Sequence, residues 1–333
     1  MLHVFGPVLS RRLGRSLGVD PIALKTCNWH CVYCQLGRST SLARERKEYV
    51  PAEDVLRDVE GALRACAPGD VDWITFGGSG EPTLHIGLGR MIRAVKEMTD
   101  VPVAVLTNGS LLYLPEVQVD LMMADAVLPT VDAGTEELYQ RTNRPRPELI
   151  FDRLVSGLVA FRRVYGGKLW VEVMLVKGLN DGDEALGDLA AVLDRIRPDE
   201  VHITVPSRAP AESWVSPPDD DRLARAAAIL GPRARIVAGT PAPLDLADHA
   251  DIEKSVVEIL TRHPMSAEDL IQAFGDPNVG LVEEALGRLR KTGRVEEVTR
   301  LGRTFWVPTG ARYAWNGTSV TPTPEPPDGT PPR

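Results

Sequence analysis

The sequence has no apolar stretch long enough to span a membrane, and its first residues lack the charged start and apolar core of a signal peptide. We therefore expect a cytoplasmic protein without membrane contact, whose cysteines stay reduced. The formal net charge of −8 argues against a surface that is basic throughout, but it leaves room for a local basic patch. A chain of 333 residues is long enough for one large core and a small appended domain.

Cysteine is scarce too, and three of the 4 cysteines stand close together as Cys27, Cys31 and Cys34. Three thiolates can hold three irons of a [4Fe–4S] cluster and leave the fourth iron open to a substrate or cofactor. The alternative is a zinc site with His30 as the fourth ligand. We favour the cluster, because the side chains of the neighbours His30 and Cys31 diverge on a regular backbone.

Six short apolar runs alternate with amphipathic stretches over the first three-quarters of the chain. The runs are 19–24, 72–76, 103–107, 126–131, 169–176 and 200–205. Candidate helices lie around 51–65, 86–98, 115–123, 148–164, 183–196 and 219–230. Continuous apolar runs are typical of strands buried on both faces, and helical crossovers make such strands parallel. We therefore predict an α/β fold, a partial (β/α)6 barrel over residues 1–238.

A second, smaller domain is expected after a linker at 239–248, where glycine and proline interrupt the pattern. Residues 249–310 contain three helical segments and a hairpin, at 252–260, 266–274, 278–291, 294–298 and 304–307. Three helices and a hairpin in about sixty residues resemble a winged helix, a variant of the helix-turn-helix. Residues 311–333 are dominated by proline, threonine and glycine, which predicts a disordered tail.

The cysteine spacing, with Tyr33 just before the third cysteine, closely resembles the signature of the radical S-adenosylmethionine enzymes. This resemblance implies a [4Fe–4S] cluster and S-adenosylmethionine as cofactors. In that family the open iron chelates the cofactor's methionine, and one electron cleaves the C–S bond to give a 5′-deoxyadenosyl radical. The resemblance therefore also implies an electron donor as a partner, and it places Tyr33 against the adenine.

A glycine-rich segment after the second predicted strand also matches this family, whose members use it to hold the methionine amino group. Gly77, Gly78 and Gly80 would let the backbone approach the ligand, and Glu81 would accept from the ammonium or fix the loop. The alternative is a tight turn with a solvated glutamate. Because chemistry gathers where the strands of a β/α barrel end, we expect this segment on the same rim as the cysteines.

Further candidates follow the later strands. Thr107 and Asn108 correspond to residues near the ribose or the methionine carboxylate in related enzymes, although an Asn-Gly turn explains them equally well. Asp132 stands where family members carry a residue facing the cofactor, and a helix cap is the alternative. Lys177 would pair with the cofactor carboxylate or an anionic substrate, or simply be a solvated strand end. Arg208, between prolines, is a candidate clamp for a carboxylate or phosphate.

Two segments narrow the resemblance to the branch that includes the wyosine-base synthases, which act on guanosine in transfer RNA. They are Gly78–Thr83 and Leu175–Asn180, and the similarity covers roughly residues 15–215. Those synthases bind a further cluster with a second set of cysteines, which Cys66 alone cannot supply. Cys66 ends a predicted helix, and we expect it to be a buried small hydrophobe.

Basic residues gather in the C-terminal domain at the third helix and the hairpin, namely Arg288, Arg290, Lys291, Arg300 and Arg303. In a winged helix these would contact phosphates, so transfer RNA or another nucleic acid is the partner that we favour. A peptide or protein partner is one alternative, and a metal- or cluster-containing regulator that binds DNA is another. If the domain only delivers the substrate, the barrel alone should carry the cofactor chemistry.

Overall fold

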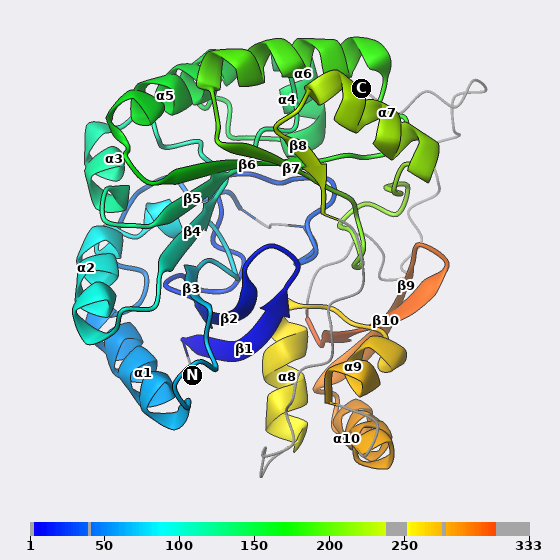
Figure 1. The fold of residues 1–333 in the computed structure, drawn as a ribbon. Coiled ribbons are helices and arrows are strands. Elements are labelled where there is room, and N and C mark those ends of the chain that lie inside the picture. The colour runs from blue at the N-terminus through cyan, green and yellow to red at the C-terminus, as the bar shows by residue number, and fades with distance from the viewer. Residues whose placement is uncertain (1–2, 39–40, 238–251, 275–277, 311–333) are drawn as a thin grey trace.

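The computed structural model describes residues 3–38, 41–237, 252–274 and 278–310, so the predicted linker and tail lie outside the described residues. Its main feature is an eight-stranded sheet in the order β1 to β8 (Figure 1). β1 (Val4–Ser10) is antiparallel to β2 (Gly14–Val19), and every later neighbour is parallel. The later strands are β3 Trp73–Phe76, β4 Val103–Thr107, β5 Ala126–Pro129, β6 Lys168–Met174, β7 Glu200–Thr204 and β8 Ala234–Ile236.

Helices cover the outer face of this curved sheet, as Figure 1 shows. They are α1 Ala52–Ala65, α2 Leu88–Met98, α3 Pro115–Leu121, α4 Glu136–Asn143, α5 Phe151–Val164, α6 Asp183–Ile196 and α7 Asp220–Leu230. One apolar face of each packs on the strands in a single large core, which includes Ile92 on α2 and Leu158 on α5. None of the described helices is both long and apolar enough to cross a membrane. The predicted α/β architecture with parallel strands is confirmed.

The first predicted strand is wrong in position. The sheet uses residues 14–19, and the apolar run after Val19 leaves the sheet as a loop. Pro21 cannot donate to a strand ladder, and the Asp20 carboxylate bonds to side chains outside the sheet instead. The edge strands were not predicted, because Gly6 and Pro7 interrupt the apolar run of β1 and β8 has only 3 residues.

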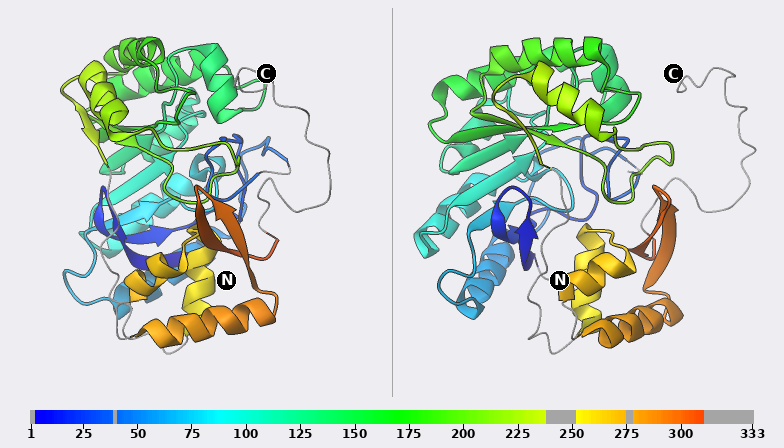
Figure 2. Two further views of the ribbon diagram at one scale, coloured as in Figure 1. Left: turned by 90° about the vertical axis from the view of Figure 1, so that its right-hand side faces the viewer. Right: turned by 45° about the vertical axis from the view of Figure 1, so that its right-hand side comes forward.

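The C-terminal region forms its own small core beside the β1–β2 hairpin (Figure 2). It consists of α8 Ile252–Arg262, α9 Ala267–Phe274, α10 Val279–Lys291, β9 Val295–Arg300 and β10 Arg303–Pro308. The two strands pair antiparallel, and an isolated bridge joins Met265 to Trp306. All five elements lie within two residues of the predicted segments, because each has a clear amphipathic pattern ended by glycine or a polar residue.

Candidate functional site

The loops that follow β2 and β3 are joined at the rim of the barrel. The Lys25 amide donates to the Ser79 carbonyl (2.6 Å), and the Glu81 amide donates to the Thr26 carbonyl (2.9 Å). Gly80 permits this contact, because a Cβ there would lie 2.0 Å from the Thr26 carbonyl oxygen. We expected Gly80 to admit the cofactor. The structure shows that it admits the backbone of the cysteine loop, so its first role is to bring the two motifs together.

Each of the three clustered cysteines receives an N–H donor. The Trp29 amide approaches the Cys27 sulfur (3.4 Å), and the Lys25 ammonium approaches the Cys34 sulfur (2.9 Å). The Asn143 amide group lies 3.7 Å from the Cys31 sulfur. Donors of this kind orient cysteine ligands and tune the potential of an iron–sulfur cluster. The donor set therefore fits a cluster. Sequence reasoning missed Lys25 and Asn143 because neither belongs to a motif.

Burial keeps two of the thiols, those of Cys27 and Cys31, in protonated form until a metal binds. Burial, followed by the charge of Glu81, raises the pKa of Cys27 to about 12. Burial also raises the pKa of Cys31 well above its usual value. Metal binding displaces such protons, so the site couples cluster assembly to proton release.

The arrangement of the three cysteines does not suit a site for a single metal ion. Among the described residues, no three His, Cys, Asp or Glu side chains are spaced to hold one metal ion. Ligands of one zinc ion all lie within about 2.3 Å of it, whereas cysteines on three different irons stand farther apart. His30 is half-buried, and its amide donates to the carbonyls of Asn143 and Arg144. The described residues therefore offer no three-ligand group for the zinc alternative.

Glu81 fixes the glycine-rich loop. Its buried carboxylate accepts four hydrogen bonds, from the Thr83 amide (3.0 Å), the Thr83 hydroxyl (2.5 Å), the Thr107 hydroxyl (2.6 Å) and the Asn108 amide (2.6 Å). Three of these reach Oε1 and one reaches Oε2. Burial raises the pKa of Glu81 despite these bonds. Glu81 is thus not the solvated residue of the alternative interpretation, and Oε2 is the oxygen with remaining capacity for a ligand ammonium.

Asn108 is part of a turn and also contacts the cysteine loop. Its side-chain oxygen accepts from the Ser110 amide (2.9 Å), as in an Asn-Gly turn. Its side-chain nitrogen donates to Asn28 (2.7 Å) and lies 3.8 Å from the Cys27 sulfur. The turn therefore also carries the amide into the cysteine loop.

Asp132 lies between the cysteine loop and β6. Its Oδ2 accepts from the Tyr33 hydroxyl and from the Asn143 amide group (2.6 Å), and its Oδ1 accepts from the Met174 amide (2.7 Å). Burial raises the pKa of Asp132 to about 6. The helix-cap alternative is wrong, because Thr135 caps α4 through its own hydroxyl.

Two other candidates lie apart from these contacts. The Lys177 side chain is 59% exposed, and its ammonium lies 3.9 Å from Asp219 at the start of α7, as suits a solvated strand end. Arg208 donates to the Pro264 carbonyl in the C-terminal region (3.5 Å). Cys66 is half-buried at the end of α1 rather than buried, because the helix ends at the surface there.

The C-terminal region inserts one arginine into the barrel. Arg262, at the end of α8, donates to Asp20 (3.0 Å), and Asp20 also accepts from the amide (3.2 Å) and hydroxyl of Ser79 in the glycine-rich loop. Gln35, next to Cys34, donates to the Arg262 carbonyl (2.7 Å). The cysteine loop and the glycine-rich loop are therefore both bonded to the C-terminal region. Sequence reasoning missed this link, because Arg262 and Asp20 are far apart along the chain and have no shared motif.

The predicted basic patch is largely ion-paired. Arg288 pairs with Glu253 and Glu284, Arg290 with Glu297, and Arg303 with Asp269. Arg300 is buried, whereas Lys291 and Arg294 are exposed. Sequence alone could not show this, because it does not tell which acids face which arginines.

Comparisons with known proteins agree with this geometry. The family model described as Radical SAM superfamily matches residues 22–190. The UPF0026 protein MJ1312 of Methanocaldococcus jannaschii is 30% identical over 311 residues, which are 92% of this chain and 96% of that protein. A protein named GTPase Obg from Brachyspira hyodysenteriae is 36% identical over 298 residues, 89% of this chain, but this chain spans only 43% of its length.

Among solved structures, Streptococcus suis SuiB bound to precursor peptide SuiA aligns with a TM-score of 0.50 and 16% identity. The alignment covers 67% of this chain and 48% of SuiB. At this identity the likeness concerns the fold alone.

Proposed function

Because this chain belongs to the radical S-adenosylmethionine superfamily, we propose that it abstracts a hydrogen atom from a substrate bound at the mouth of its barrel. The protein is a radical S-adenosylmethionine enzyme, and its cofactors are a [4Fe–4S] cluster and S-adenosylmethionine. When bound, these cofactors supply a 5′-deoxyadenosyl radical. The observation that carries the proposal is the joined rim, where the cysteine and glycine-rich loops share backbone hydrogen bonds.

In this proposal Cys27, Cys31 and Cys34 hold the cluster, and an electron donor supplies the electron that it needs. Tyr33 and Asp132 lie together beside the cysteine loop, where they would face the adenosine part of the cofactor. Glu81, Thr107 and Asn108, with the backbone of Gly77 and Gly78, would hold its methionine part. Lys177 has no place in this set, because its side chain lies with Asp219.

The substrate class that we propose is nucleic acid, transfer RNA in particular, presented by a winged-helix-like C-terminal domain. Three helices, a hairpin and the Met265–Trp306 bridge support this domain type. The exposed Lys291 and Arg294, at the end of α10 and the start of the hairpin, would meet phosphates first. The resemblance of the rim motifs to those of the wyosine-base synthases supports the same substrate.

The test uses the full chain, reconstituted without oxygen and supplied with S-adenosylmethionine and a reductant. We expect unfractionated transfer RNA to increase 5′-deoxyadenosine formation and to change in mass. Binding should weaken as salt rises, since each phosphate contact releases counterions. In the double variant Lys291→Gln, Arg294→Gln, the slope of the logarithm of the binding constant against the logarithm of salt concentration should fall by about two, one for each lost phosphate contact. The matched variant Arg57→Gln, on α1, should leave this slope unchanged. Salt-independent binding, or none with any RNA or DNA, would defeat the nucleic-acid proposal.

A peptide substrate is the second candidate, and one observation favours it. A mostly apolar cavity of about 320 Å³ lies on the C-terminal region between α9, α10 and β10, and Lys291 of the basic patch lines it too. The lining residues are Ala267, Glu283, Leu286, Gly287, Arg290, Lys291 and Trp306. Apolar pockets of this kind suit a hydrophobic side chain better than a phosphate. Stimulation of 5′-deoxyadenosine formation by a peptide library, and loss of that stimulation in Trp306→Ala, would favour this candidate.

A further inference from the structure

The interior of the barrel is layered along β6. Trp170, Glu172 and Met174 alternate with residues that face the helices, so they share the inner face of the sheet. Trp170 packs with Leu13 and Trp73 in an apolar floor. Met174 belongs to the cofactor layer, because its amide donates to Asp132. Glu172 lies between them, about 7 Å from Met174 along the strand, and forms a charged layer below the cofactor residues.

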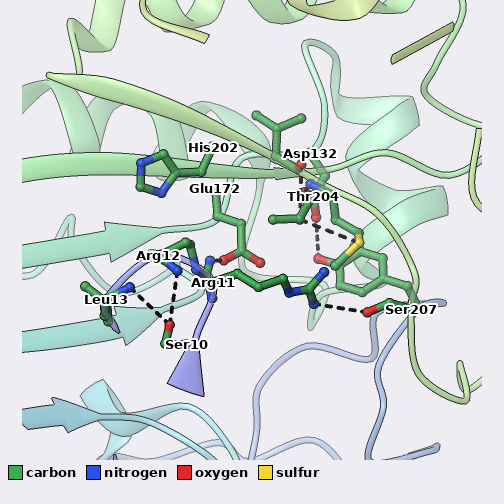
Figure 3. A network of polar contacts seen from close by, with 12 residues as sticks. Ser10, Arg11, Arg12, Leu13, Asp132, Glu172, His202, Thr204 and Ser207 are labelled. Carbon is green, nitrogen blue, oxygen red and sulfur yellow. Dashed lines mark hydrogen bonds and ion pairs between the residues drawn. The ribbon is translucent and has the colours of Figure 1, made fainter. Parts of the chain in front are cut away.

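The turn between β1 and β2 carries two arginines on the open side of the barrel, and a third follows β7. Arg12, in the turn between β1 and β2, pairs with Glu172. Arg11 reaches across to the loop after β7 and donates to the Ser207 hydroxyl (3.0 Å), as Figure 3 shows. Arg208 follows Ser207 directly, and its charge interacts with that of Arg11. The turn after β1 therefore brings Arg11 beside the segment that carries Arg208, nearly two hundred residues later in the sequence.

The positive charge of this group is not balanced by its neighbours. Glu172 forms its ion pair with Arg12. Asp269 attracts Arg208, but it already forms an ion pair with Arg303 (3.2 Å). In the part of the chain that the structure describes, Arg11 has no ion pair.

The pKa values of these arginines report the same imbalance. Burial and then the charge of Arg11 lower the pKa of Arg12 and of Arg208 to about 10 each. A bound anion would relieve this repulsion.

We propose that Arg11, Ser207 and Arg208 form an oxyanion site that receives a phosphate or carboxylate group of the substrate. Arg11 and Ser207 are exposed, so a ligand can reach them, and a planar guanidinium binds either group through two parallel hydrogen bonds. Thr204, which begins the segment leading to Ser207, contacts the Met174 sulfur (3.7 Å) in the cofactor layer. An anionic group held here therefore places the rest of the substrate beside Asp132. The anion site itself does not depend on the proposed function. Only the identity of the substrate that carries the anionic group rests on it.

The test is calorimetric titration of inorganic phosphate, and separately of succinate, into the reconstituted full chain at constant ionic strength. We expect one of the two anions to bind more tightly than chloride. Arg11→Gln should weaken the binding of that anion about tenfold, the usual loss for one charge-assisted contact. Arg208→Gln should weaken its binding by a similar factor. Preference for phosphate identifies a phosphorylated group, and preference for succinate identifies a carboxylate.

The control is Arg64→Gln, whose arginine is exposed on α1 and pairs only with the neighbouring Glu60 among the described residues. It should bind the anion like the wild type. Equal affinity in Arg11→Gln and wild type, or no anion that outcompetes chloride, would overturn the oxyanion site. The titration needs no turnover, so this failure is distinct from failure of the wild type to cleave S-adenosylmethionine, which would defeat the proposed function.

Discussion

Arg262, where the C-terminal region meets the barrel, is buried, whereas the arginines on the outer face of the C-terminal region, such as Arg288 and Arg290, are exposed. The Arg262 and Asp20 side chains at the domain boundary are 7% and 4% exposed, whereas Arg288 is 54% exposed. Breaking a buried pair leaves a charge without water or partner, whereas breaking an exposed pair changes little. Arg262 is thus a buried link between the C-terminal region and the barrel.

The largest effect should come from the cysteine loop itself. Replacing Cys31 with alanine should abolish both cluster assembly and S-adenosylmethionine cleavage, because the cluster loses one of its three ligands. Cys66→Ala, at the end of α1, should retain about four irons per chain and full cleavage. Iron analysis and 5′-deoxyadenosine formation check both variants. Equal loss in Cys66→Ala would show that the ligand set is wrong.

A smaller but still large effect is expected at the domain boundary. Arg262→Gln should lower the free energy of unfolding by about 3 kcal/mol, because it leaves Asp20 buried without its charge partner. It should also weaken S-adenosylmethionine binding, since Asp20 holds Ser79 in the glycine-rich loop. Urea denaturation and calorimetry under argon measure the two effects.

The double variant Arg262→Met, Asp20→Asn serves as the control for this experiment. It removes both charges, so it should recover part of the lost stability. If the single variant is as stable as the wild type, the boundary pair carries no structural role. The sequence had predicted that the barrel would carry its chemistry without the C-terminal domain. Arg262 donates a hydrogen bond to Asp20 and accepts one from Gln35, and these bonds predict instead that removing the domain weakens cofactor binding.

The sequence predicted those parts of the molecule whose signals are local. The spacing of Cys27, Cys31 and Cys34 stands in eight consecutive residues, and the buried strands are continuous apolar runs. The strand at 14–19 was missed because glycine, arginine and serine begin it. Contacts between distant residues left no trace in the sequence, as the examples of Asn143 beside Cys31 and Arg11 beside Ser207 show. Roles that depend on such contacts required the structure.

The pH dependence of stability tests the effect of another buried group, the imidazole of His202. His202 is fully buried near Arg12, with Glu200 and Arg235 at its Nε2. Burial, then the charge of Arg12, lowers its pKa to about 4 from an ordinary value of 6.5. As pH falls from 6.5 to 4, the unfolded chain takes up a proton that the folded chain refuses, so stability falls by about 1–3 kcal/mol.

The comparison with His202→Gln isolates this effect, because carboxylates elsewhere titrate equally in both proteins. The difference in unfolding free energy between wild type and variant should be constant above pH 6.5. Below pH 6.5 the wild type should lose unfolding free energy relative to the variant, and this loss should level off near pH 4. Parallel curves over the whole range would mean that His202 titrates normally.

The smallest effect is expected on the surface of the C-terminal domain. Arg288→Gln should leave the free energy of unfolding unchanged within error, although Arg288 pairs with both Glu253 and Glu284. These side chains are solvated, so water replaces the lost partner and salt already screens the pair. Urea denaturation in the same series as Arg262→Gln measures the contrast directly, at low and at high salt. A clear loss of stability in Arg288→Gln that disappears at high salt would show that surface pairs stabilise this domain, and the distinction between buried and exposed arginines would no longer hold.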